Sequence, residues 1–110
     1  MEMVERRTLT EAQVMGAIER AAQALNFLVY HTRYAVGSAP GFPDLIVCGH
    51  GRVWAWEIKG PKGRVSDAQS AWLSAMQQAD MSAQVVWPDD LDDILAILLD
   101  AHQVAHGGTA

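Results

Sequence analysis

The sequence lacks several features that each define a class of protein. It has one cysteine, Cys48, so no internal disulfide can form. No apolar run approaches the roughly 20 residues needed to cross a bilayer, and residues 1–7 lack the apolar segment of a signal peptide. No internal repeat or low-complexity segment is present. We therefore expect a cytoplasmic protein without a membrane partner, in which Cys48 is buried in the apolar run 45–48 and has no catalytic role.

Basic residues are absent from the C-terminal part of the chain. All eight Lys and Arg lie in residues 1–64 beside six acids, whereas residues 65–110 hold seven acids, so the two parts carry net charges of +2 and −7. The overall charge of −5 argues against a nucleic-acid partner, because Lys and Arg that neutralise phosphates dominate such affinity. Cations bound to acids of the first part would reverse the local field there. The charge balance therefore permits DNA as a partner without requiring it.

What is present is the composition of one globular domain. Of 110 residues, half are hydrophobic and 19% are charged. We expect a single domain over residues 1–110, with a core of about 8–101 and a tail of 102–110. A chain of this length buries only a modest core, so pairing with a second copy would be unsurprising.

Helix and strand signals alternate along the chain in the order α-β-β-β-α-β-α. Thr10 with Gln13 forms a capping box and Ser66 is an N-cap, and each precedes a run of helix formers, while Asn26 tolerates the left-handed geometry that ends a helix. The expected helices cover residues 10–25, 66–79 and 88–101, and the expected strands cover 27–34, 44–48, 52–59 and 83–87. A helix between the last two strands implies a parallel pair. We therefore expect an α/β fold with a mixed sheet and helices against its faces.

One strand carries charge where its apolar pattern predicts burial. Glu57 and Lys59 are two residues apart and share one face of the strand 52–59. Burying both charges without compensation would cost several kcal/mol. The simple alternative is an ion pair between them, which is common for a bare Glu-x-Lys tripeptide. However, Asp44 leads into the preceding strand, and a hairpin through Gly49-His50-Gly51 brings it to the same edge of the sheet as Glu57.

Two carboxylates and one lysine at one sheet edge favour a metal site. Close carboxylates repel each other, which raises the pKa of one of them unless a cation lies between. Magnesium prefers oxygen ligands and uses one or two protein carboxylates, which leaves positions for water and phosphate. Such an ion delivers a deprotonated water and neutralises charge on a phosphate, while Lys59 stabilises that charge or orients the water. The arrangement suits phosphodiester hydrolysis.

Glu11 is a candidate third acid. It lies three residues before Val14 and seven before Ile18, so we expect it on their buried stripe. The helix dipole alone also favours an acid in the first turn, and this alternative stays open.

Three short motifs follow one another in an order that resembles a known family. They are Gly41-Phe42-Pro43-Asp44-Leu45-Ile46, then Glu57-Ile58-Lys59-Gly60, then Val65-Ser66 with Gln69 and Trp72-Leu73. Together they resemble the VRR-NUC branch of the PD-(D/E)XK nuclease superfamily, and the likeness covers about residues 8–99. The resemblance implies a restriction-endonuclease-like αβββαβ core, with a mixed sheet flanked by helices, plus a C-terminal helix.

The resemblance also implies roles for individual residues. Asp44 and Glu57 would be ligands of Mg²⁺ or Mn²⁺, with help from the main-chain carbonyl of Ile58. Lys59 would be the catalytic lysine. Glu11 matches the acid that the family places early in its first helix, which makes it a further candidate ligand.

Four more residues flank this expected site. Gln69 matches a glutamine of the family's second helix near the catalytic residues, where its amide would hold a water or a phosphate; an exposed helical amide is the alternative. Arg33, Lys62 and Arg64 lie on flanking segments and are candidates for binding the DNA backbone. Simple solvated charge is the alternative for these three residues.

Aromatic residues and histidines near these segments have more than one interpretation. Tyr30, Tyr34 and Phe42 are candidates for stacking on a base, although packing is the more common role of aromatic residues beside an apolar strand. The four histidines lack the short, paired spacing of a zinc site, so we expect them at the surface or as satisfied core residues.

The leading hypothesis is a Mg²⁺- or Mn²⁺-dependent deoxyribonuclease that cuts DNA as an endonuclease. Stand-alone members of the family look like Holliday-junction resolvases that act as dimers. This resemblance implies branched DNA as a substrate, a homodimer, and a phage-like protein in a bacterial cell or phage-infected host. One alternative is a catalytically silent DNA-binding or protein-interaction module that keeps the nuclease fold. Another is a structural subunit whose acidic C-terminal helix docks a basic partner.

Overall fold

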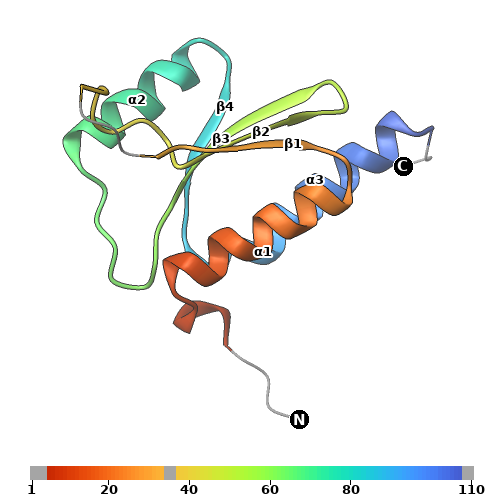
Figure 1. The fold of residues 1–110 in the computed structure, drawn as a ribbon, viewed down its shortest axis with the longest axis horizontal. Helices are drawn as coiled ribbons and strands as arrows, with labels where there is room; N and C mark the ends of the chain where they lie inside the picture. Colours follow the sequence, from red (N-terminus) through yellow and green to blue (C-terminus); the bar gives the residue numbers. More distant parts are fainter. Residues whose placement is uncertain (1–4, 34–36, 108–110) are drawn as a thin grey trace.

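The computed structural model describes residues 5–33 and 37–107, and it has the predicted order of helices and strands (Figure 1). The helices are α1 (Glu11–Ala24), α2 (Asp67–Gln78) and α3 (Leu91–Ala105), with two short 3-10 helices, η1 (Arg6–Thr8) and η2 (Pro88–Asp90). The strands are β1 (Leu28–His31), β2 (Leu45–Gly49), β3 (Arg52–Ile58) and β4 (Ser82–Val86). β1 is shorter than the expected strand 27–34, whose last residue, Tyr34, lies outside the described residues.

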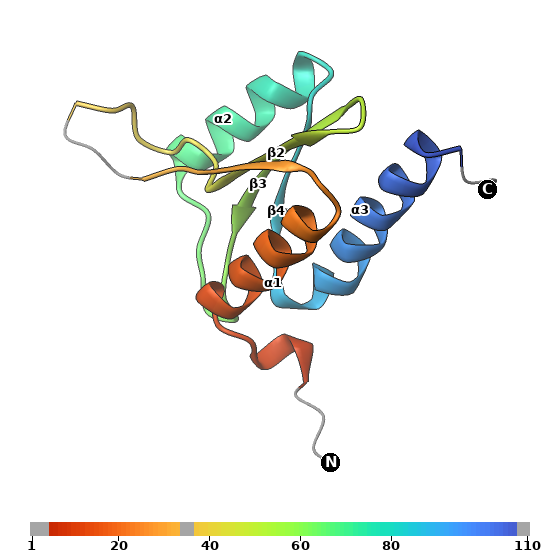
Figure 2. The same cartoon turned by 45° about the vertical axis from the view of Figure 1, so that its right-hand side comes forward.

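The four strands form one mixed sheet in the order β1-β2-β3-β4. β1, β2 and β3 pair antiparallel, and β4 pairs parallel to β3 after the crossover through α2. α1 and α3 lie against one face of the sheet and α2 against the other (Figure 1 and Figure 2). The predicted mixed sheet with flanking helices is confirmed.

The main core lies between the sheet and the pair of helices α1 and α3. Val14 and Ile18 of α1 and Leu98 of α3 are fully buried there. Trp54 and Trp56 of β3 face the same core, as their alternation along the strand predicts. Each large apolar side chain buried in this way contributes about 1.5–3 kcal/mol. This core therefore fixes the position of β3.

The opposite face of the sheet is only partly covered. α2 packs on β3 and β4 through a second, smaller core of buried residues, Ala55, Leu73 and Ala83. β1 and the hairpin between β2 and β3 lie beyond the reach of α2. Their side chains on this face consequently stay open to solvent, with Leu28 77% and Val53 39% exposed.

Cys48 belongs to this open part of the sheet. It pairs with Leu28 on one side and with Val53 on the other, and it is exposed. The expectation that Cys48 is buried was wrong. The residues of β2 alternate between the two faces, so only Leu45 and Val47 of the apolar run reach the main core.

Left-handed backbone ends two helices and forms the hairpin. Asn26 follows α1 with φ 64°, which agrees with the prediction that it ends the helix, and Asp80 follows α2 with φ 63°. His50 and Gly51, with φ of 50° and 79°, form the two-residue turn between β2 and β3. This tight turn sets the register of the two strands.

α3 continues to Ala105, whereas the sequence pattern predicts an end near Ala101. Residues 102–105 are therefore helical and not a tail. Ala101 is the last buried residue of α3, so the apolar pattern ends before the helix does. None of the helices within 5–33 and 37–107 combines the length and apolarity needed to cross a membrane.

Candidate active site

The strand register places Asp44 beside Glu57. Leu45 of β2 pairs with Trp56 of β3, and one further step of this antiparallel register sets Asp44 opposite Glu57. On the other side, the Thr32 N–H donates to the Asp44 main-chain carbonyl at 2.8 Å, which extends the pairing of β1 and β2 by the same step. Asp44 and Glu57 therefore share one face of the sheet, at the end where β2 begins and β3 finishes.

The Asp44 carboxylate is held by the main chain of β3. Its Oδ2 accepts a hydrogen bond from the Ile58 N–H at 2.8 Å. Pro43 is buried just before Asp44 and has no N–H to donate, and its carbonyl accepts from the Thr32 hydroxyl at 2.7 Å. The chain thus leaves regular strand pairing at Pro43, and the Asp44 side chain takes the place of a strand carbonyl beside Ile58.

Glu57 is almost fully buried, with 2% of its surface exposed. Its Oε2 accepts from the Gln69 amide at 2.9 Å and lies 3.3 Å from the Lys59 Nζ. Its Oε1 is buried and has no hydrogen-bond partner among the described residues. Burial, and then the neighbouring Asp44 carboxylate, raise the pKa of Glu57 from 4.5 to about 7, against the opposing effect of Lys59. Folding therefore leaves this carboxylate only partly compensated.

Lys59 is 8% exposed, and its ammonium lies between two side chains. The Nζ donates to Gln69 Oε1 at 3.0 Å and pairs with Glu57. The Lys59 N–H donates to the Val86 carbonyl at 2.9 Å, which continues the pairing of β3 with β4. Gly63 packs on the methylene stem, since a Cβ at Gly63 would lie 2.9 Å from the Lys59 Cδ. The loop after β3 consequently encloses the stem and directs the charge toward Glu57.

Gln69 connects both charges to the first turn of α2. It forms a capping box with Ser66, in which the Gln69 N–H donates to Ser66 Oγ at 3.1 Å and the Ser66 N–H donates to Gln69 Oε1 at 2.9 Å. The same Oε1 accepts from Lys59, so the Gln69 Nε2 is directed at Glu57. Gln69 therefore lies in the cluster, as the resemblance implied, and is not a solvated helical amide.

A glycine brings the loop before β2 against α2. Gly41 has φ +88°, and a Cβ there would lie 2.4 Å from the main-chain carbonyl carbon of Ala68. A side chain at this position would therefore displace the helix and strain the backbone. The contact places the Asp44 segment and the first turn of α2 at one site.

The oxygens of this cluster fit a divalent metal ion. Asp44 and Glu57 present two carboxylates on one face, which is the number that magnesium commonly takes from a protein. The partnerless Oε1 of Glu57 is an oxygen that a cation would satisfy. The main-chain carbonyl of Ile58 belongs to the same strand end and completes the predicted ligand set. This donor set is one of hard oxygens, which suits Mg²⁺ or Mn²⁺ better than softer metals.

Glu11 lies at the same end of the sheet, outside this cluster. Its main chain packs against Gly60, where a Cβ would lie 3.1 Å from the Glu11 nitrogen. Its side chain is exposed, so the expectation that it shares the buried stripe of Val14 and Ile18 was wrong. Within 5–33 and 37–107, no three His, Cys, Asp or Glu side chains come together as ligands for one ion. A ligand role for Glu11 stays a prediction.

Comparison with known families identifies the kind of domain that carries this cluster. The VRR-NUC domain matches residues 3–87, a range that includes every residue of the cluster. The chain belongs to the VRR-NUC family. The match assigns a nuclease-type domain to the protein and ends before α3. A comparison with curated proteins finds no match.

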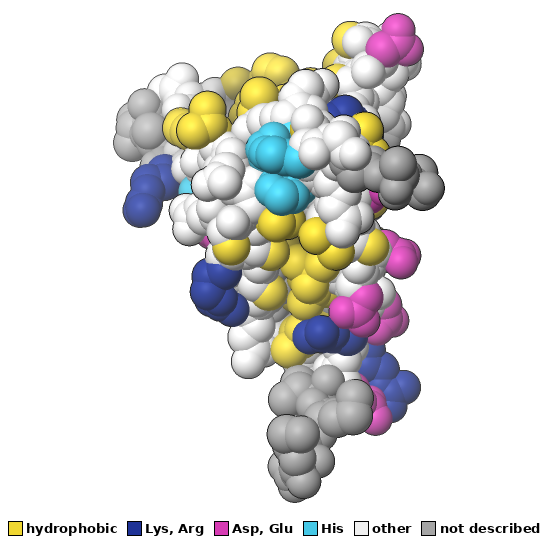
Figure 3. All heavy atoms as spheres, turned by 90° about the vertical axis from the view of Figure 1, so that its right-hand side faces the viewer, with side chains coloured by type: hydrophobic (Ala, Val, Ile, Leu, Met, Phe, Trp, Pro, Cys, Tyr) yellow, Lys and Arg dark blue, Asp and Glu magenta, His cyan; other side chains and the backbone are white. Residues whose placement is uncertain are grey.

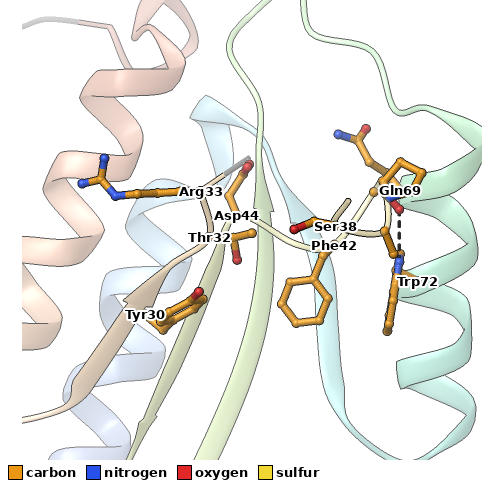
Figure 4. A pocket seen from close by; sticks show the side chains of 11 residues that line it. Tyr30, Thr32, Arg33, Ser38, Phe42, Asp44, Gln69 and Trp72 are labelled. Carbon is orange, nitrogen blue, oxygen red and sulfur yellow. Dashed lines mark hydrogen bonds between the residues drawn. The ribbon is translucent and has the colours of Figure 1, made fainter. Parts of the chain in front are cut away.

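The basic candidates of this VRR-NUC domain lie around the cluster. Arg33 lines a pocket together with Asp44 and Gln69 (Figure 4). Lys62 and Arg64 are exposed on the loop between β3 and α2. Their roles in DNA binding stay predictions.

Three histidines of the VRR-NUC chain gather at the hairpin between β2 and β3, the opposite end of these strands from the cluster. Figure 3 shows histidine side chains side by side on the surface. The ring centroids of His102 and His106 are 4.3 Å apart, and His50 lies 5.2 Å and 5.0 Å from them. His50 bonds the Leu25 carbonyl at 2.7 Å and His106 bonds the His102 carbonyl at 2.8 Å, so the expectation of satisfied histidines is confirmed for these two. Partial burial, and then the two neighbouring imidazoles, lower the pKa of His102. His102 and His106 lie four residues apart and so share one face of α3, and only the fold adds His50 to them.

Thr32 is a residue of the VRR-NUC site that the sequence reasoning missed. It fixes Pro43 and Asp44 through two hydrogen bonds. A threonine near a strand end has many ordinary roles, and only the sheet register singles this one out.

The raised pKa of Glu57 predicts a pH dependence of stability in the metal-free protein. Its folded pKa of about 7 lies above the ordinary 4.5, so the folded state retains a proton that the unfolded state loses between these values. The free energy of unfolding of the wild type should therefore fall, relative to that of Glu57→Gln, as pH rises from 4.5 to 7. Urea unfolding of both proteins with chelator, at a series of pH values, measures this difference. If the difference in unfolding free energy between the two proteins stayed constant from pH 4.5 to 7, the raised pKa of Glu57 would be contradicted.

Proposed function

We propose that this VRR-NUC protein is a Mg²⁺- or Mn²⁺-dependent endonuclease that hydrolyses DNA phosphodiester bonds. The observation that carries the proposal is the buried Glu57 carboxylate, which lies beside Asp44 and has one oxygen without a partner. Keeping the Glu57 and Asp44 carboxylates next to a buried lysine lowers the stability of the fold. A metal-assisted reaction on phosphate would explain why these residues are present.

Asp44, Glu57 and the main-chain carbonyl of Ile58 would hold the metal ion. When bound, the ion supplies positive charge against the phosphate and makes water a stronger nucleophile. Asp44 keeps its orientation through the Ile58 N–H, so the carboxylate does not have to be ordered when DNA binds.

Lys59 provides the positive charge that the protein itself contributes. Its stem is enclosed and its ammonium is placed by Glu57 and Gln69, so it meets an incoming phosphate in a fixed position. Charge that develops on the phosphate during hydrolysis is stabilised most when the stabilising groups are already in place. Gln69 orients both neighbours, and the second N–H of its Nε2 is left to donate to a water or a phosphate oxygen.

DNA is proposed to approach from the face of the sheet that carries α2. Arg33, Lys62 and Arg64 belong to the segments around the cluster on this side, and they supply charge for backbone contacts. Five of the seven acids of residues 65–110 lie in α3 or directly before it, and α3 lies against the other face of the sheet (Figure 1). Repulsion between these acids and phosphate favours the same approach.

Removing either charge of the Glu57–Lys59 pair is expected to slow cleavage strongly. Glu57→Gln keeps the shape but removes a metal ligand, and Lys59→Ala should lower the rate by about 100-fold or more. Supercoiled, flap and four-way DNAs incubated with Mg²⁺ or Mn²⁺ provide the assay, with chelator as the blank. Asp100→Asn, which removes an exposed acid from α3, is the matched control and should cleave like the wild type.

Two results would favour other functions. DNA binding without metal-dependent cleavage on any of these substrates would favour a catalytically silent module. Absence of both binding and cleavage would favour a structural subunit whose acidic α3 contacts a basic partner.

We further propose that the nuclease acts as a homodimer, because two copies place two sites on the two strands of a branched DNA. Two exposed apolar side chains of α3, Ile97 and Val104, lie seven residues apart on one side of the helix and support an association of this kind. Light scattering on purified protein should give twice the 12.0 kDa of one chain. A monomer that cleaves at full rate would contradict the dimer and leave the catalytic proposal standing.

A further inference from the structure

A pocket of about 630 Å³ opens directly beside the catalytic cluster (Figure 4). It lies between the end of β1, the loop before β2 and the first turns of α2. Asp44 and Gln69 form part of its lining, so the pocket and the cluster share two side chains. A group that occupies the pocket is therefore adjacent to the phosphate on which the cluster would act.

One wall of this pocket is an aromatic pair that is fixed before any ligand binds. Phe42 and Trp72 meet edge to face, with ring centroids 5.1 Å apart. The Trp72 indole N–H donates to the Pro40 carbonyl at 3.2 Å, which ties the ring to the loop before β2. The close contact of Gly41 with α2 holds the same loop. The wall therefore needs no ordering when a flat ligand enters.

The opposite wall is an aromatic ring without a packing partner in the core. Tyr30 is 62% exposed and stands on the part of the sheet that α2 leaves open. In Figure 4, Tyr30 lies on one side of the pocket, and Phe42 and Trp72 lie on the other. The tryptophans of β3, in contrast, are buried in the main core. An exposed ring that faces an aromatic wall offers a stacking surface rather than core stability.

The polar groups of the pocket leave hydrogen-bonding capacity for the edge of a base. The Ser38 hydroxyl both donates and accepts, the Thr32 hydroxyl can still accept while it donates to Pro43, and the Gln69 Nε2 keeps a second N–H beside the one given to Glu57. Arg33 also lines the pocket and provides charge for a phosphate of the same strand. Aromatic walls, hydrogen-bonding groups and one cation together suit a nucleotide.

We propose that this pocket receives an unpaired nucleobase next to the scissile phosphate, stacked on Tyr30. A base in intact duplex has both faces stacked on its neighbours and cannot enter without leaving the helix. Unpaired positions at flaps and bulges avoid that step, so the pocket selects DNA that contains unpaired bases. This inference rests on the proposed nuclease function, because it places the base relative to the phosphate that is cut.

The test uses a duplex with one unpaired 2-aminopurine, a base whose fluorescence falls when it stacks on an aromatic ring. A dye at the far end reports binding by its anisotropy, and chelator prevents cleavage. The wild type should bind and quench the 2-aminopurine. Tyr30→Ala should bind the DNA with little quenching. Tyr30→Phe should quench like the wild type, because the ring and not the hydroxyl provides the stacking surface.

Leu28→Ala is the matched control. Leu28 lies on the same strand and face as Tyr30, is 77% exposed and does not line the pocket. This variant should quench like the wild type. Equal quenching by Tyr30→Ala and Leu28→Ala, or bound DNA without quenching by the wild type, would overturn the inference.

Cleavage with added metal then separates the inference from the proposed function. Replacing the unpaired nucleotide by an abasic residue should slow wild-type cleavage by about tenfold, which is the order expected for one stacked base. Cleavage without this dependence would overturn the base pocket and leave the nuclease standing. Quenching that depends on Tyr30, without cleavage of any DNA, would overturn the nuclease and leave the pocket standing.

Discussion

The Glu57 carboxylate, buried beside the carboxylate of Asp44, is the constraint on which the rest of the site depends. Two negative groups on one face of a sheet are unfavourable unless other groups compensate them. Lys59 and Gln69 compensate one oxygen of Glu57, and the Ile58 N–H compensates Asp44. The other oxygen of Glu57 is left buried without a partner among the described residues, and it is the oxygen that the proposed metal ion would satisfy.

The surrounding fold keeps these groups together through register and packing. The two-residue hairpin at His50 and Gly51 sets the pairing of β2 with β3, and the α1–α3 core holds β3 from the opposite face. On the site face, small residues let α2 approach β3 closely, but α2 does not reach β1. The face packed against α1 and α3 therefore holds the strands in place. The face that α2 covers only in part leaves room for a pocket and for DNA.

Most of the architecture could be predicted from the sequence, because its signals are local. Capping residues begin helices, alternation marks β3, and the order of elements implies the parallel pair. The predicted hairpin was sufficient to place Asp44 and Glu57 at the same edge of the sheet. The exposure of Cys48 and of Glu11 was not predictable in this way, because it depends on how far α2 extends over the sheet and how α1 is rotated. Likewise, the apolar pattern of α3 stops at Ala101, although the helix continues. The pocket joins segments that only tertiary structure brings together.

The most direct measurement of the central claim is calorimetric titration of Mn²⁺ into the protein, repeated in buffers of different ionisation enthalpy. A Glu57 carboxyl with a pKa of about 7 must lose its proton when it binds the ion. The account therefore predicts release of about one proton per bound ion at pH 6 and much less at pH 8, with binding strongly weakened in Asp44→Asn. Failure to bind Mn²⁺, or binding that is unchanged in Asp44→Asn and releases no proton at pH 6, would contradict it.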